Sequence, residues 1–132
     1  MRVIGIEGKD QAAGEFVLEA LQRAVEADRV TLEDIALAMK EADGKVKIHQ
    51  TKGSILGHLH DRGVSDKLMK NVTETLEPGQ TMVFALGTDE VIKAVDDRVK
   101  ELSDGEFATF IVDQESPDAL QQVTAQLALK ND

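Results

Sequence analysis

Apolar residues recur along this chain at two spacings, and segments of the two kinds alternate. A period of two or an unbroken apolar run indicates a β-strand, whereas apolar residues three and four apart indicate a helix that covers a core. Strands are therefore expected at residues 2–7, twice within 34–50, at 80–86 and at 107–112. Helices are expected between Asp10 and Asp28, from Ser65 to Pro78, from Thr88 to Gly105, and after Ser116. Residues 54–61 fit either a short helix or an irregular turn.

The residues around Asp43-Gly44 predict a β-hairpin. An Asp-Gly pair between two alternating runs is typical of a two-residue type I′ turn, in which both central residues take positive φ. The first strand places Ile35, Leu37 and Met39 on a single face by its period of two. The second strand separates its apolar and polar side chains onto two faces, namely Val46 and Ile48 against Lys45, Lys47 and His49. This one-sided polarity predicts a sheet with one face on helices and one more open face.

Each predicted helix has an apolar stripe, and three have a recognisable start. Ser65 and Thr88 are suited to cap helix N-termini, and Ser116-Pro117 supplies a cap followed by proline at the first helical position. The side chains expected to be buried on the first three helices are Phe16, Val17, Leu21, Ala24, Val25, Leu68, Met69, Val72, Leu76, Val91, Ile92, Val95, Val99 and Leu102. The last helix carries Leu120, Val123, Ala125 and Leu127, and Met39, Met69 and Met82 are expected to fill the core.

The order β-α-β-β-α-β-α-β-α predicts an α+β fold in one domain, residues 1–132. Its first six elements match the ferredoxin-like βαββαβ unit, and an αβα-type addition follows at the C-terminus. A helix between the fourth and fifth strands implies a parallel crossover. We therefore expect a mixed sheet with its helices mainly on one face.

Composition narrows the class of protein. The chain has a net charge of −10, four Phe, no Trp or Tyr, and no Cys. A negative field repels phosphate backbones, and few aromatic rings are available to stack on bases, so nucleic-acid binding is disfavoured. The lack of Cys excludes disulfides, thiol nucleophiles and thiolate metal sites. With no apolar leader after Met1 and no run of about 18 apolar residues, we expect a cytoplasmic protein without a membrane span.

Three histidines form the one group of side chains with metal-binding character. His58 and His60 are two residues apart beside Asp61, and His49 lies on the predicted hairpin. His58 and His60 converge if their backbone is extended and diverge by about 200° on a helix. Because no further ligand is visible, surface histidines in a loop are the simpler interpretation, and we assign no metal or cofactor.

Two other motifs invite a chemical interpretation. The acidic pairs Glu33-Asp34, Asp89-Glu90 and Asp96-Asp97 are interpreted as residues of helix starts and polar helix faces rather than as general acids and bases. The segment Gly5-Ile6-Glu7-Gly8-Lys9 lies between a strand and a helix, where phosphates bind in nucleotide folds. It lacks both G-x-G-x-x-G and G-K-[ST], so turn glycines are the favoured interpretation. No catalytic residues are assigned, and we expect a protein that is not an enzyme.

Several segments resemble a bacterial family numbered 1269 among domains of unknown function. The similarity covers most of residues 2–112 and is most specific at two turns, Asp43-Gly44-Lys45-Val46 and Leu76-Glu77-Pro78-Gly79. Members of that family typically carry a long glycine- and alanine-rich apolar segment after the hairpin, and they are often described as membrane proteins. Only residues 53–59 remain of it here, so the chain resembles a short form. The resemblance implies a fold and a loose association with bacterial stress proteins, but no catalytic mechanism.

The leading functional hypothesis is a domain that acts through protein–protein contact, namely self-association into a homo-oligomer, with no other protein partner identified. A sheet with few strands and an open face or edge must be paired, covered or charged. The alternative is a small-molecule or metal-binding sensor that uses His49, His58 and His60.

Overall fold

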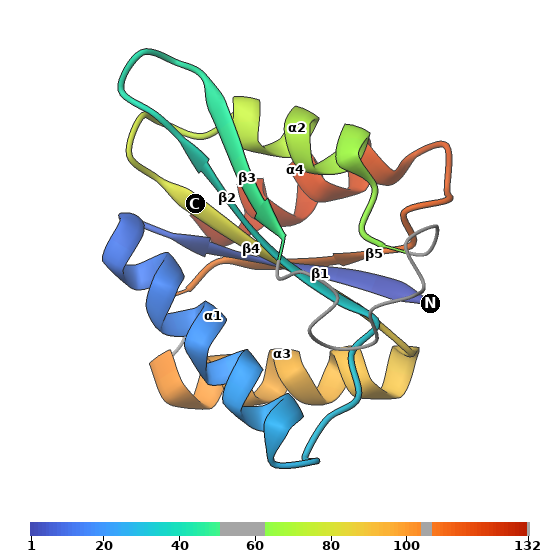
Figure 1. Ribbon diagram of the computed structural model, residues 1–132. Coiled ribbons are helices and arrows are strands. Elements are labelled where there is room, and N and C mark those ends of the chain that lie inside the picture. The colour runs from blue at the N-terminus through green and yellow to red at the C-terminus, as the bar shows by residue number, and fades with distance from the viewer. Residues whose placement is uncertain (51–62, 104–106, 132) are drawn as a thin grey trace.

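The computed structural model describes residues 1–50, 63–103 and 107–131 (Figure 1). The elements are β1 (Arg2–Gly8), α1 (Gln11–Glu26), β2 (Asp34–Lys40), β3 (Val46–Gln50), α2 (Asp66–Glu74), β4 (Thr81–Gly87), α3 (Asp89–Ser103), β5 (Thr109–Val112) and α4 (Ala119–Asn131). The α+β class and the predicted order of elements are confirmed. Ser65 and Thr88 cap α2 and α3, because their hydroxyls accept hydrogen bonds from the backbone N–H groups of Leu68 and Val91.

The five strands form one sheet in the order β3-β2-β4-β1-β5, and every neighbouring pair is antiparallel. The predicted mixed sheet is therefore wrong. The reason is that α1, α2 and α3 each connect two parallel strands that are not adjacent. An antiparallel strand lies between the two strands of each such pair. Strands β4 and β5 do run parallel, as the crossover through α3 requires, but β1 lies between them and pairs with both.

A ferredoxin-like unit is present, but different elements build it from those expected. In that unit, two βαβ segments interlock so that each crossover spans one strand of the other segment. Here the interlocked segments are β1-α1-β2 and β4-α3-β5. The hairpin strand β3 and helix α2 are an insertion between the two, and α4 is added after β5. The expectation that the first six elements form the unit is corrected accordingly.

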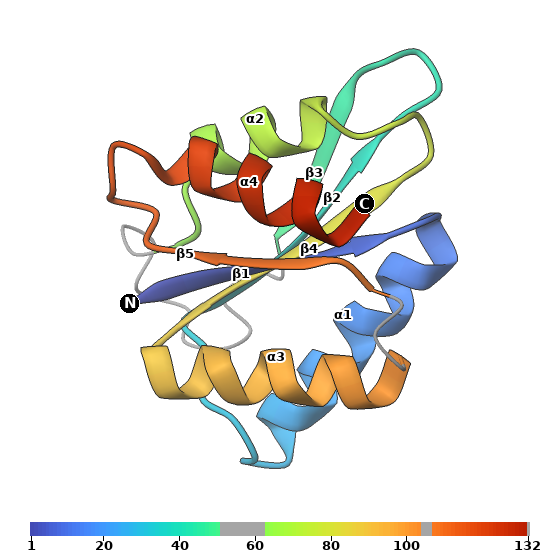
Figure 2. The ribbon, with the colours of Figure 1, turned by 180° about the vertical axis from the view of Figure 1, so that it is seen from behind.

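The inserted crossover β3-α2-β4 has the opposite hand to β4-α3-β5. Strands β3, β4 and β5 run in the same direction, and both crossovers step the same way across the sheet. The two helices nevertheless lie on opposite faces of the sheet (Figures 1 and 2). Right-handed crossovers are the strong rule, so one of these two is an exception. The consequence of this arrangement is that both faces of the sheet receive a helical layer.

Helices α1 and α3 cover one face and α2 and α4 cover the other (Figure 2). All seven residues of β4 are buried, and their side chains alternate between two cores. Met82, Phe84 and Leu86 belong to the core under α2 and α4, whereas Val83 and Ala85 belong to the core under α1 and α3. The predictions of an open face and of helices mainly on one face are therefore wrong. The alternation in β3 is real, but it describes only the edge of the sheet.

The hairpin between β2 and β3 forms, with a different turn from the one predicted. Within this turn, Gly44 has positive φ, at +88°, whereas Asp43 does not. The Gly44 N–H donates to the Glu41 carbonyl at 2.9 Å, and the Asp43 carboxylate accepts from the Lys45 N–H at 2.9 Å. This is a three-residue connection in which a type I turn is followed by a glycine in the left-handed region, rather than a type I′ turn. The Asp-Gly signal therefore identified the hairpin but not the loop length.

The two edges of the sheet differ in how they are protected. On β5, the backbone N–H of Ile111 donates to Gln126 Oε1 at 2.8 Å, and Gln126 Nε2 donates to the Ile111 carbonyl at 2.9 Å. A side chain of α4 thus occupies both backbone hydrogen-bonding groups of Ile111 in this short edge strand. On β3, the exposed side chains are Lys47 and His49, with Lys45 just before the strand. Lysine on an edge strand is a common device against edge-to-edge pairing.

We predict that Gln126→Ala lowers the free energy of unfolding by about 1–2 kcal/mol, because two hydrogen bonds to Ile111 are lost. Chemical denaturation monitored by circular dichroism measures this loss. Gln122→Ala is the matched control, since Gln122 is exposed on the same helix, and its effect should stay within about 0.5 kcal/mol. Equal stabilities of the two variants would contradict the role given to Gln126.

Candidate interaction surface

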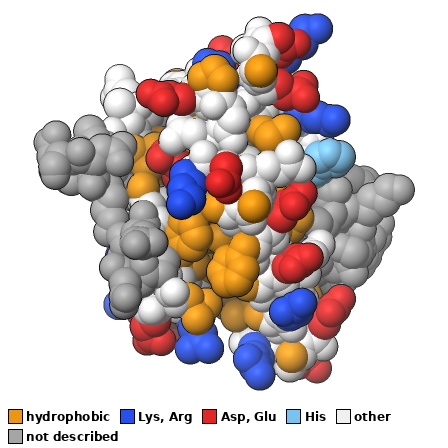
Figure 3. Space-filling model, turned by 90° about the vertical axis from the view of Figure 1, so that its left-hand side faces the viewer, with side chains coloured by type: hydrophobic (Ala, Val, Ile, Leu, Met, Phe, Trp, Pro, Cys, Tyr) orange, Lys and Arg blue, Asp and Glu red, His pale blue; other side chains and the backbone are white. Residues whose placement is uncertain are grey.

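An apolar groove runs between α1 and α3 on the outside of their layer. It encloses about 630 Å³, and both helices line it together with the segment that follows α1. Val17 and Leu21 form its floor from α1, and Val95 and Val99 form its floor from α3. Figure 3 shows the left-hand side of the view in Figure 1. Hydrophobic side chains gather on its lower half, where α1 and α3 lie. We call this hollow and its rim the α1–α3 groove.

Two large apolar side chains of the groove are exposed, which the helical spacing did not predict. Phe16 is 57% exposed and Leu102 is 56% exposed, although both were expected to be buried. The sheet-facing stripe of α1 consists of Gly14, Val17 and Leu21, and Phe16 lies beside that stripe rather than on it. Among the described residues, only Met1 and Leu120 are other large apolar side chains with comparable exposure.

A sequence signal for the groove was available in the width of the apolar stripes. On α1, Phe16, Ala20 and Ala24 form a second stripe beside the one that faces the sheet, and the C-cap residue Ala27 continues it. On α3, Ala94 and Leu102 do the same. A helix that only covers a sheet needs a single stripe, so the extra width indicates a second apolar contact. Because Phe16, Ala24 and Leu102 were all expected to be core residues, this surface was not predicted.

Arginines surround the apolar floor. Arg23 and Arg29 line the groove from the α1 side, and Arg98 lines it from α3. Arg98 pairs with Glu101 one turn further along at 3.4 Å, and both side chains are largely exposed. Within the described part of the chain, no carboxylate lies within ion-pair distance of Arg23 or Arg29. The groove therefore combines apolar surface with available positive charge in a chain whose net charge is −10.

Among the described residues, the three histidines are not brought together into a metal site. His49 lies exposed on the edge strand β3, whereas His58 and His60 fall outside the described residues. Across residues 1–50, 63–103 and 107–131, no three His, Asp or Glu side chains gather closely enough to hold a metal ion. Residues 54–61, which were expected to form a short helix or an irregular turn, and Gly105 also fall outside the described residues.

The acidic pairs have structural partners that the sequence did not reveal. Asp96 is buried, accepts a hydrogen bond from the Thr109 hydroxyl at 2.8 Å and pairs with Lys100 at 2.9 Å, so it ties α3 to β5. Asp34 opens a strand rather than a helix, and its carboxylate accepts from the Val64 N–H at 2.9 Å. Asp89 pairs with Arg2 at 3.3 Å on the surface. The interpretation as polar helix faces is therefore wrong for Asp34 and Asp96.

Gly5 and Gly8 are packing glycines rather than turn glycines. A Cβ atom on Gly5 would lie 2.0 Å from the Phe110 ring, and one on Gly8 would lie 2.6 Å from the Thr81 hydroxyl. Phe110 fills the space above Gly5 and meets Phe84 edge to face, with ring centroids 6.2 Å apart. A phosphate would also meet the Asp10 carboxylate, which already accepts a hydrogen bond from the Ala13 N–H at the start of α1. The Asp10 carboxylate at the start of α1 therefore disfavours an anion at this strand-to-helix junction.

Glu7 lies between these glycines, and its side chain is half-buried. Removal from water raises the pKa of its carboxyl above the ordinary value. Because the folded chain then holds the proton more tightly than the unfolded chain, charged Glu7 destabilises the fold. The stability that neutral Glu7 gives the fold is present at low pH. It is lost as the pH rises from the ordinary carboxyl pKa, about 4, through the raised value.

We predict that Glu7→Gln is more stable than the wild type at pH 7, and that this difference disappears as the pH falls towards 4. Denaturant unfolding across that range measures the effect. Glu77→Gln serves as the control because Glu77 is exposed, so its difference from the wild type should depend little on pH. A pH-independent effect of Glu7→Gln would count against burial as the cause.

Comparisons with known proteins identify the family. No curated protein and no solved structure matches the sequence. Among the described residues, no helix is both long enough and apolar enough to cross a bilayer. The family model described as "protein of unknown function (DUF1269)" matches residues 44–125, from the hairpin turn into α4. Since this match covers more than half of the chain, the protein belongs to the DUF1269 family.

Proposed function

We propose that this protein acts through protein–protein contact and self-associates through the α1–α3 groove. The observation that carries the proposal is the pair of exposed side chains, Phe16 and Leu102, beside an apolar hollow. A surface that carries both protruding apolar side chains and an apolar hollow can bind the same surface of a second copy related by a two-fold axis. Phe16 of one copy then fills the hollow of the other.

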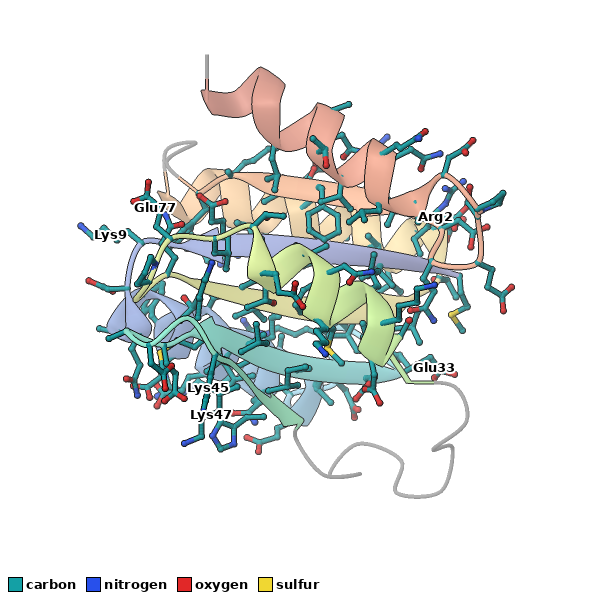
Figure 4. All side chains as sticks on the ribbon, turned by 90° about the horizontal axis from the view of Figure 1, so that it is seen from above. Arg2, Lys9, Glu33, Lys45, Lys47 and Glu77 are labelled. Atoms are coloured by element: carbon teal, nitrogen blue, oxygen red, sulfur yellow. The ribbon has the colours of Figure 1, made fainter. Side chains whose placement is uncertain are left out.

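The other routes to self-association have less support. Pairing of two sheets face to face is blocked because helices cover both faces. The β5 edge is occupied by Gln126. Pairing of two β3 edges would bring Lys45 and Lys47 of both copies together, and like charges across strands are destabilising. Figure 4 shows these lysines projecting from the same edge of the molecule.

Charge around the groove also favours a second copy. Arg23, Arg29 and Arg98 lie at the groove, while Glu19 and Glu101 are exposed on the same two helices. Across a two-fold axis, the arginines of one copy can face the acids of the other. Such pairs fix orientation more than they add affinity.

The size of the surface sets the strength that we expect. Helix α1 is about 24 Å long, and two helices side by side are about 20 Å wide. The face therefore offers about 500 Å² per copy, against about 800 Å² in a standard interface. The dimer should consequently be reversible, with a dissociation constant in the micromolar range or weaker.

We predict that the wild type shifts from monomer to dimer as its concentration rises, and that the double variant Phe16→Ser, Leu102→Ser stays monomeric. Sedimentation equilibrium and light scattering measure the change. Leu120→Ser is the matched control, because Leu120 is 40% exposed on α4, in the opposite helical layer, and its loss should leave the dimer intact. A wild type that remains monomeric up to about 1 mM, or a double variant that dimerises equally well, would end the proposal.

A further inference from the structure

A second hollow lies in the opposite helical layer, between α2 and α4 at one end of the sheet. It has a volume of about 490 Å³ and is lined by Glu7, residues around the end of α2, and both buried and exposed residues of α4. Leu76, Val123 and Leu127 are buried apolar residues in its wall, and Leu120 lies at its exposed margin. We call this hollow the Glu7 cleft.

Most polar side chains of the Glu7 cleft already have partners. The Thr75 hydroxyl donates to the Val72 carbonyl at 2.6 Å, and the Thr124 hydroxyl donates to the Leu120 carbonyl at 3.1 Å. Gln80 Oε1 accepts from the Glu77 N–H at 2.8 Å. The Glu7 carboxylate differs, because within the described residues it has neither a hydrogen bond nor an ion pair. Burial accordingly raises its pKa, as a negative charge without a partner would require.

The charged groups near the cleft do not compensate Glu7. Glu77 is exposed at the rim and adds negative charge. Lys9 lies at the same end of the molecule but extends away from its body (Figure 4). The Lys40 ammonium is engaged by the Glu74 carbonyl at 2.8 Å. The C-terminal end of α2 also lies at the cleft, and helix C-termini favour cations.

We propose that the Glu7 cleft binds a small organic cation, a primary ammonium group carried on an apolar chain. The ammonium pairs with the Glu7 carboxylate, and the chain lies against Leu76 and Leu127. This assignment rests on charge complementarity combined with apolar walls. A metal ion fits less well, because Ca²⁺ and Mg²⁺ require several oxygen ligands and the cleft offers one half-buried carboxylate. An anion would be repelled by Glu7 and Glu77.

Binding is tested with n-hexylammonium chloride at pH 7.5, by following backbone amide chemical shifts of the ¹⁵N-labelled protein. We expect shifts at Glu7, Gln80 and Thr124. The uncharged 1-hexanol, with the same chain, should bind about tenfold more weakly, because it lacks the charge-assisted hydrogen bond. Hexanoate, which carries the opposite charge, should bind more weakly still.

Two variants distinguish the contribution of the Glu7 carboxylate to binding from the contribution of the rest of the cleft. Glu7→Gln should reduce the affinity for hexylammonium to that for hexanol and leave hexanol binding unchanged, which also shows that the cleft remains folded. Glu77→Gln should change the affinity for hexylammonium less than twofold. The proposal is overturned if the wild type binds hexylammonium no better than hexanol, if Glu7→Gln binds it as tightly as the wild type, or if shifts occur only at the α1–α3 groove. The variant Phe16→Ser, Leu102→Ser should bind the amine normally, so this test stands or fails independently of self-association.

Discussion

The architecture depends on a sheet whose central strands are apolar on both faces. Every residue of β4 is buried, and β1 contributes Val3 to one core and Ile4 and Ile6 to the other. Such strands cannot leave either face in water, because burial stabilises by roughly 25 cal/mol per Å² of apolar surface. Two helical layers are therefore required, and α2 and α4 form the second layer. The hand of the β3-α2-β4 crossover, opposite to that of β4-α3-β5, is a consequence, since it places α2 on the face that α1 and α3 do not cover.

The two helical layers satisfy this requirement differently, and the difference creates the surfaces available for binding. Helices α2 and α4 approach one another over their face, whereas α1 and α3 mainly contact the sheet. In Figure 1 the axis of α1 is inclined to that of α3, so their outer sides are not in close contact. The wide apolar stripes of these helices then meet solvent at Phe16 and Leu102. Among the described residues, the α1–α3 groove is thus the part of the core under α1 and α3 that no other element covers.

Rules that depend on neighbouring residues predicted the helices and strands well. The predictions of how these elements pack together failed for identifiable reasons. Caps such as Ser65 and Thr88 depend on a few neighbouring residues, and both were found. The open face was inferred from β3, an edge strand, and then applied to the whole sheet. The continuous apolar run of residues 81–87 was the better guide, since strands buried on both faces do not alternate. Gly5 could not be interpreted from sequence alone, because its role depends on Phe110, more than a hundred residues away.

The sheet also separates the two candidate sites. The α1–α3 groove and the Glu7 cleft belong to opposite helical layers, so a dimer formed through the groove leaves the cleft accessible. Their charges also differ in sign, because arginines surround the groove whereas a carboxylate lies in the cleft. Strand β1 nevertheless links them: Ile6 packs in the core beneath the groove, and the next residue, Glu7, lines the cleft. A shift of β1 at Glu7 would therefore also displace Ile6, because both residues lie on one strand that pairs with β4 and β5.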